Sequence, residues 1–335
     1  MRRIAVLNQK GGVGKTTTTA NLGAALALSG ARVLLIDLDP QGHLSLHFGV
    51  ELTDGQPSVY DVLTASAPVR DVAIKARENV TLLAADIDLA GAEAELVSVM
   101  GREVLLREAL EPVLSEFDCV LIDCPPSLGV LTVNALVAAN EVLIPLQAHF
   151  LALQGLSRLF QTVTLVRQRI NADLRVGGIV LCLHESTTRL AGEVVDDLKR
   201  FLDGARGTNA AWSDAKLFET CIRRNIKLAE SSSFGQTVFD YAPRSNGAAD
   251  YAQLAVEMFG EAARIDTAAA FSTPPPTAPA QPEIPSTAPS PPVTFASPSE
   301  RVSASGTAPA PTWIAPSHGE SVVSDVRGHP VPAAP

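Results

Sequence analysis

The sequence lacks the features of secreted and membrane-spanning proteins. Its 335 residues include only four cysteines, none in a CxxC pattern, which favours reduced thiols over a disulfide framework. The first apolar run, residues 4–7, is far too short for a secretory signal. No stretch approaches the ~20 apolar residues that cross a bilayer. We therefore expect a cytoplasmic protein with no membrane partner.

Positive charge is also scarce. Lysine and arginine total 26 against 36 aspartates and glutamates, giving a net charge of −10. This balance argues against a protein coated in basic residues for nucleic acid. It leaves room for a local basic patch, because phosphate contacts are made locally.

Proline is concentrated at one end of the chain. Of the 24 prolines, 16 follow Phe271. Residues 266–335 are rich in Pro, Ala and Ser, and such a composition cannot bury enough apolar surface to offset the entropy of ordering. We expect a disordered tail over 266–335 and a folded domain over 1–265, long enough for a sizeable core.

Strand and helix patterns alternate along the folded part. Nearly continuous apolar runs, typical of strands covered on both faces, occupy residues 2–8, 32–39, 80–86, 117–125, 141–147 and 175–183. Helical periodicity occupies residues 16–29, 101–114, 151–171, 188–203 and 247–264. Residues 204–214 interrupt the pattern as a loop. The order predicts a doubly wound α/β fold, with a mostly parallel sheet and helices on both faces.

A glycine-rich stretch, NQKGGVGKTTTT at residues 8–19, separates the first strand from the first helix. Glycines let the backbone N–H groups wrap around phosphate oxygens, and the helix N-terminus adds partial positive charge. Lys15 is expected to reach the β- and γ-phosphates, and the Thr16 hydroxyl to ligate Mg²⁺. The predicted nucleotide-binding residues are Gly11, Gly12, Val13, Gly14, Lys15, Thr16 and Thr17.

Lys10 is a second lysine at the mouth of this loop. It could contact the phosphates of its own nucleotide. It could instead reach the nucleotide of a second subunit, as an arginine finger supplies a cation in trans. The second option would make ATP the link of a dimer.

The stretch KGGVGKTTTTANLG resembles the deviant Walker A motif of the ParA/MinD class of P-loop ATPases, whose signature lysine corresponds to Lys10. Three further stretches resemble the ParA (Soj-like) partitioning branch: VLLIDLDPQGHLS, VLIDCPPSLGVLTVNAL and TCIRRNIKLAESSSFG. The resemblance covers residues 2–262. It implies a ParA-like P-loop fold over 1–265 and slow hydrolysis of ATP with Mg²⁺, in which Lys10 and Lys15 take part.

Three aspartates close two of the predicted strands. The resemblance implies that Asp39 positions or activates the attacking water. Asp37 lies two residues earlier on the same side of the strand and is expected to support the magnesium shell or the loop. Asp123 occupies the Walker B position, holding Mg²⁺ directly or through water. Cys124 is interpreted as a small buried residue.

Basic residues cluster near the end of the folded part. Arg224 falls on the arginine of the family's IPRN stretch, and the resemblance implies that it contacts DNA without sequence preference, with Arg223 and Lys227 as further candidates. Arg223 stands where the family has proline, and Asn246 where it often has arginine. The first departure adds charge to the expected DNA surface and the second removes it, and both leave the ATPase motifs intact.

The resemblance implies an ATP-bound homodimer that coats the nucleoid, with hydrolysis stimulated by a ParB-like activator that moves a chromosome, a plasmid or other cargo. Because the N-terminus before the first strand is short, we expect no helix-turn-helix domain, and we expect the ending GHPVPAAP not to form a membrane helix like that of MinD. One alternative is an orphan ATPase switch that controls a non-DNA complex. Another is electron transfer through a cysteine-bound cluster, as in nitrogenase reductase.

Overall fold

A computed structural model describes residues 1–149, 152–185 and 189–265, with no side-chain description for 152–154 and 189–191. The expected tail at 266–335 lies outside the described residues.

The sheet follows the order β3-β4-β2-β5-β1-β6-β7-β8, with β9 paired to β7. All pairs are parallel except β3 with β4. The strands are β1 (Arg2–Val6), β2 (Val33–Asp37), β3 (Ile74–Arg77), β4 (Val80–Leu83), β5 (Cys119–Asp123), β6 (Glu141–Leu146), β7 (Arg175–His184), β8 (Lys216–Leu217) and β9 (Ile222–Arg223). The mostly parallel sheet is confirmed, and the six predicted strands correspond to β1, β2, β4, β5, β6 and β7.

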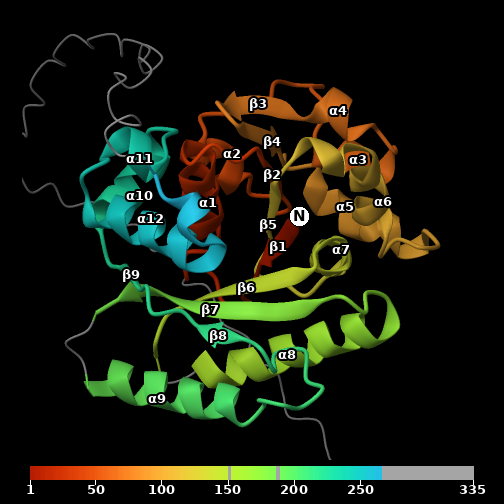
Figure 1. Cartoon of the computed structure of the whole chain (residues 1–335). Coiled ribbons are helices and arrows are strands. Elements are labelled where there is room, and N and C mark those ends of the chain that lie inside the picture. Colours follow the sequence, from red (N-terminus) through yellow and green to blue (C-terminus); the bar gives the residue numbers. More distant parts are fainter. Residues whose placement is uncertain (150–151, 186–188, 266–335) are drawn as a thin grey trace, which may run out of the picture. The chain divides into compact units, whose positions relative to one another are not determined.

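Helices cover both faces of the sheet, as Figure 1 shows. One core packs under α3–α9, and the other under α1, α2 and α10–α12. The helices are α1 (Lys15–Leu28), α2 (His43–His47), α3 (Val59–Thr64), α4 (Val69–Val72), α5 (Leu89–Glu95), α6 (Leu105–Leu110), α7 (Val130–Ala138), α8 (Ala152–Arg169), α9 (Arg189–Asp203), α10 (Ile226–Ser233), α11 (Val238–Tyr241) and α12 (Asn246–Phe259). Short 3₁₀ turns are η1 (Leu96–Ser98), η2 (Glu111–Glu116) and η3 (Glu261–Ala263).

Two predicted helices end earlier than the sequence periodicity indicates. The helix expected over 101–114 is the shorter α6, followed by η2, whose second residue is Pro112; proline has no N–H to continue an α-helical ladder. The helix expected over 247–264 ends at Phe259, because Gly260 has a φ of 82°. Ile170, which falls within the helix predicted over 151–171, lies beyond α8 and is 37% exposed.

The central position of β1 places the phosphate loop. β1 lies between β5 and β6, and its carboxyl end leads directly into the loop before α1. α1 packs closely over the sheet, since a Cβ added at Gly23 would come 2.7 Å from a methyl carbon of Leu35. The carboxyl ends of β1, β2 and β5 therefore meet beside the helix N-terminus, where α/β folds bind ligands.

No helix within the described ranges combines the length and the apolar character needed to cross a bilayer.

A close backbone contact joins two distant segments and supplies a test of the fold. Gly235 has a φ of 61°, and a Cβ there would come 2.7 Å from Gly49 Cα. We expect Gly235→Ala to lower the free energy of unfolding by about 2–4 kcal/mol, through φ strain and overlap together. Gly207→Ala is the matched control: its φ is 72° but its surroundings are open, so about 1 kcal/mol is expected. Urea denaturation measures both, and equal losses would contradict the contact.

Candidate nucleotide site

The loop between β1 and α1 presents free backbone donors. Gly12 and Gly14 have φ values of 70° and 92°, which glycine adopts without strain. Gly14 is the N-cap residue of α1, and no side chain caps the helix there. The first N–H groups of α1 are therefore available to a ligand. Such a terminus favours an anion, since unsatisfied donors and the helix dipole act together.

Lys15 lies across the base of this loop. The residue is only 7% exposed, and its Nζ donates to the carbonyl oxygen of Lys10 at 3.3 Å. Burial lowers the pKa of Lys15, while the charges of Asp123 and Asp39 oppose that shift. A partly desolvated ammonium beside free helix donors is suited to bind phosphate oxygens.

Two buried carboxylates stand side by side at the strand ends. Asp37 of β2 is in register with Asp123 of β5, and both are fully buried. Burial raises the pKa of each above the ordinary carboxyl range. The charge of Asp37 raises the pKa of Asp123 further, whereas hydrogen bonds from Thr16 and Thr19 and the charge of Lys15 lower it.

The two carboxylates differ in their hydrogen bonds. Asp37 Oδ1 accepts from the backbone N–H of Asp39 at 3.2 Å, and its Oδ2 accepts from the backbone N–H and hydroxyl of Ser45, each at 3.1 Å. Asp123 Oδ1 accepts from the Thr19 hydroxyl at 3.2 Å. Asp123 Oδ2 is buried and has no partner within the described part of the chain.

The unpartnered oxygen of Asp123 fits a magnesium ion. A buried anionic oxygen without a donor needs a positive counterpart, and Mg²⁺ prefers carboxylate, hydroxyl, water and phosphate oxygens. The Thr16 hydroxyl, the other predicted ligand, is one of the groups that lower the pKa of Asp123. Both oxygens of Asp37 are already occupied, so its geometry fits a support of the loop better than a ligand.

Asp39 lies at the rim of the same site. It is half-buried, its N–H is held by Asp37, and its Oδ1 accepts from the backbone N–H of Gln41 at 3.0 Å. The charge of Asp39 opposes the lowering of the Lys15 pKa by burial. This position is suitable for a group that orients a water at the phosphates.

The first lysine of the loop lies apart from this charged group. Lys10 is exposed, its N–H donates to Asn8 Oδ1 at 3.0 Å, and its Nζ contacts His149 Nε2 and lies 3.5 Å from Gln147 Oε1. Both side-chain partners follow β6. Within the described residues, the ammonium thus contacts its own subunit through two solvent-exposed side-chain contacts.

Each of the three basic DNA candidates is ion-paired. Arg223 donates from its backbone and guanidinium to the nearly buried Asp250 at 2.6–3.1 Å. Arg224 Nε donates to Glu185 at 2.6 Å, and Lys227 Nζ donates to Glu230 at 2.7 Å. The structure brings the cations together on β9 and the start of α10, but it neutralises all of them.

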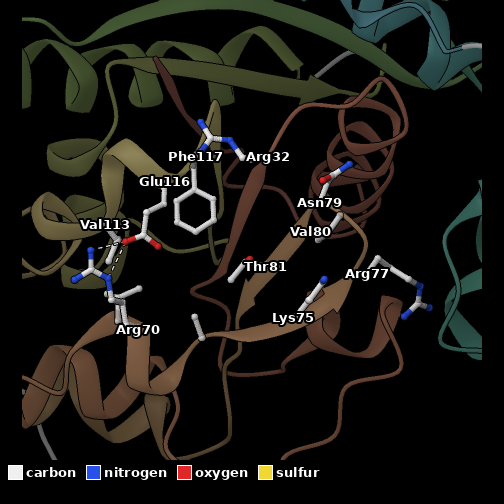
Figure 2. Close-up of a pocket in the computed structure, with 12 residues that line it drawn as sticks. Arg32, Arg70, Lys75, Arg77, Asn79, Val80, Thr81, Val113, Glu116 and Phe117 are labelled. Carbon is white, nitrogen blue, oxygen red and sulfur yellow. Dashed lines mark hydrogen bonds and ion pairs between the residues drawn. The ribbon is translucent and has the colours of Figure 1, made fainter.

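A separate hollow of about 420 Å³ lies among β3, β4, α4 and η2 (Figure 2). Its three arginines each pair with an acidic residue: Arg70 Nε donates to Glu116 at 2.7 Å, Arg32 pairs with Asp118 at 2.8 Å, and Arg77 Nε lies 3.6 Å from Asp240 Oδ2. The phosphate loop does not line it. The hollow therefore offers an anion few free donors, unlike the loop.

Several contributing residues escaped prediction. Thr19 lies one turn after Lys15, a spacing that could have placed it on the same helix face. Ser45 closes the quoted stretch VLLIDLDPQGHLS, eight residues after its partner Asp37. Glu185 carries no such signal, because its partner Arg224 is 39 positions away. Cys119, Cys124 and Cys182 are buried thiols, and Cys221 is half-buried, so the interpretation of Cys124 as a small buried residue is confirmed.

Comparison with known proteins identifies the family. The chain matches the model of a family described as an AAA domain over residues 1–176. It is 46% identical over 257 residues to the sporulation initiation inhibitor protein Soj of Bacillus subtilis, covering 76% of this chain and 97% of Soj. It is 43% identical over 261 residues to the chromosome partitioning protein ParA of Caulobacter vibrioides, covering 77% and 94%.

The chain belongs to the ParA and Soj family of P-loop ATPases. A solved structure named cobyrinic acid a,c-diamide synthase from Mycobacterium smegmatis, with bound ADP and magnesium, is 41% identical. It has a TM-score of 0.60 and covers 70% of this chain and 92% of its own. These matches confirm the resemblance to the ParA/MinD class of P-loop ATPases that the sequence motifs indicated.

The buried carboxylates predict how stability depends on pH without metal or nucleotide. Because their folded-state pKa values are raised, the folded protein holds more protons than the unfolded one, and stability falls as pH rises from the ordinary carboxyl range through neutrality. Each proton that the folded state holds and the unfolded state does not lowers the free energy of unfolding by up to about 1.4 kcal/mol for each pH unit of increase. Asp123→Asn stays neutral, so its free energy of unfolding should fall less between pH 6 and 8.

Asp118→Asn is the control for this experiment. Its hydrogen bonds with Arg32 lower the pKa of Asp118 to about 2, so it titrates well below the measured window. Urea denaturation of the three proteins at several pH values measures the effect. The same decline in the wild type and in Asp123→Asn would show that Asp123 is already ionised when empty.

Proposed function

We propose that the loop binds ATP with Mg²⁺ and that the bound nucleotide converts the protein into a DNA-binding dimer. The observation that carries this is the combination of free α1 donors, buried Lys15 and the unpartnered oxygen of Asp123. Lys15 would bind the β- and γ-phosphates, while Thr16 and Asp123 would hold the ion. The ion supplies positive charge to the transferring phosphoryl group.

Hydrolysis needs a positioned water and an added cation. We assign the water to the rim position of Asp39, and the cation to Lys10 of a second subunit. The exposed contacts of Lys10 with Gln147 and His149 are weak enough to be exchanged for a phosphate. Dimerisation would then depend on ATP, and hydrolysis would return each lysine to its resting place.

Among the basic residues, Arg224 is the best DNA contact. Arg223 ties β9 to α12 through the nearly buried Asp250, and removing it would leave that carboxylate unpaired. Lys227 shares Glu230 with the Tyr241 hydroxyl. Arg224 has one exposed carboxylate partner, so it can be released at the lowest cost.

The proposed role is partitioning. The names of Soj and ParA support it, and it implies a cytoplasmic, nucleoid-associated protein whose slow hydrolysis a ParB-like activator stimulates. An orphan switch acting on a non-DNA complex, or a synthase as the M. smegmatis name suggests, would not require ATP-dependent DNA binding. Co-sedimentation with DNA in ATP, ADP and no nucleotide separates these functions from partitioning.

Asp39 and Lys10 together test the dimer. Asp39→Ala should retain ATP and accumulate a dimer, because water is no longer positioned. Adding Lys10→Ala should return the protein to a monomer that still binds ATP, since Lys15 and the loop remain. Sedimentation velocity in ATP measures the mass, and Lys75→Ala, an exposed lysine at the hollow, is the control. A dimer that survives Lys10→Ala would contradict a role in trans.

Arg224 tests the DNA surface. Arg224→Gln should lower DNA affinity in ATP by about tenfold or more while the dimer persists, because each subunit loses one phosphate contact. The slope of log affinity against log salt should become shallower by about one per subunit. Arg70→Gln, an exposed paired arginine at the hollow, should leave both unchanged. Unaltered binding by Arg224→Gln would move the DNA site elsewhere.

A further inference from the structure

The guanidinium of Arg224 is held by an acidic residue of another segment. Arg224 Nε donates to Glu185 Oε1 at 2.6 Å, with side chains 61% and 53% exposed. The backbone N–H of Arg224 also donates to the carbonyl oxygen of His184 at 3.4 Å. Both the main chain and the side chain of Arg224 are thus fastened to the end of β7, which Figure 1 shows beside β9.

The same strand end packs against the phosphate loop. A Cβ added at Gly14 would lie 3.6 Å from Cys182 Cβ, and the Thr18 hydroxyl lies 3.7 Å from Cys182 Sγ. Glu185 follows Cys182 by only three residues, directly after β7 ends. A change in the loop on nucleotide binding therefore has a short, packed path to the carboxylate that holds Arg224.

The neighbouring ion pairs are built differently. Asp250 is nearly buried and accepts four hydrogen bonds from three N–H groups of Arg223, which makes that pair structural. Lys227 and Glu230 are three residues apart on α10, so they move together. Arg224 and Glu185 lie on separate segments and share one hydrogen bond in solvent, where such pairs are weak.

We propose that Glu185 is a regulatory carboxylate that occupies Arg224 in the resting protomer and competes with DNA phosphate for it. The inference rests on the proposed function, since it takes Arg224 as the DNA contact. A phosphate oxygen makes the same charge-assisted hydrogen bond to a guanidinium as a carboxylate does. While Glu185 stays in place, its carboxylate repels a DNA phosphate that approaches Arg224. The nucleotide state that displaces Glu185 should therefore have the higher affinity for DNA.

Glu185→Gln removes the competing charge and keeps the size of the side chain. DNA affinity should rise by roughly two- to five-fold for each subunit that binds DNA, which corresponds to the free energy of one exposed ion pair. For a dimer in which both subunits bind the same DNA, the fold-increase should be the square of this value. The gain should be larger in ADP or without nucleotide than in ATP. In the wild type, DNA binding frees the Glu185 carboxylate, which takes up a cation and offsets the cation released from the phosphate. In Glu185→Gln this uptake is absent, so the slope of log affinity against log salt should steepen by up to about one per subunit.

Control variants make the result decisive. Glu219→Gln removes an exposed carboxylate whose side chain forms no ion pair with any residue in 1–149, 152–185 and 189–265, and should leave affinity nearly unchanged. Glu185→Gln combined with Arg224→Gln should lose the gain. Fluorescence anisotropy with a labelled non-specific duplex measures all variants across salt. Without DNA, the basal ATPase activity of Glu185→Gln should match that of the wild type.

Two outcomes distinguish the inference from the function beneath it. If Arg224→Gln weakens DNA binding but Glu185→Gln gains no more than Glu219→Gln, the regulatory role of Glu185 is wrong and the DNA site stands. If Arg224→Gln binds DNA like the wild type, the DNA site itself is wrong and the inference falls with it. A gain from Glu185→Gln that is equal in ATP and in ADP would overturn the nucleotide dependence.

Discussion

The balance of buried charge at one edge of the sheet governs the rest of this structure. Parallel pairing of β2 with β5 brings Asp37 and Asp123 into register, both fully buried, and the nearly buried Lys15 enters the same region from α1. Asp37 is satisfied by Ser45 and Asp39, which fixes the loop after β2. Asp123 keeps one oxygen without a donor, so the edge is complete only when positive charge arrives with a ligand.

Around this fixed centre, the groups that we expect to move are weakly held. Lys10 contacts an amide oxygen and an imidazole nitrogen at the surface, and Arg224 shares one solvent-exposed hydrogen bond with Glu185. An exposed ion pair such as that of Arg224 contributes roughly 0–1 kcal/mol, so it is readily exchanged for a phosphate. Lys15 and Asp123 are buried and fixed, whereas Lys10 and Arg224 are loosely held. This arrangement suits a protein that switches between two states better than one that turns over rapidly.

The sequence predicted most of what depends on contiguous residues. Six strands, the parallel sheet and the phosphate loop follow from runs that carry their own periodicity or motif. β3, with the sequence IKAR, was missed because two of its four residues are charged, and β8 and β9 are too short for any period. The ion pair of Arg224 with Glu185 spans 39 positions and exists only because β9 pairs with β7.

The claim most open to a direct check is that Lys10 serves the nucleotide of a second subunit. The measurement is a crystal structure of the Asp39→Ala protein with ATP and magnesium. We expect two subunits facing each other across their nucleotides, with each Lys10 ammonium within hydrogen-bonding distance of the partner's phosphates. A single subunit with ATP bound and Lys10 still against Gln147 and His149 would contradict the account.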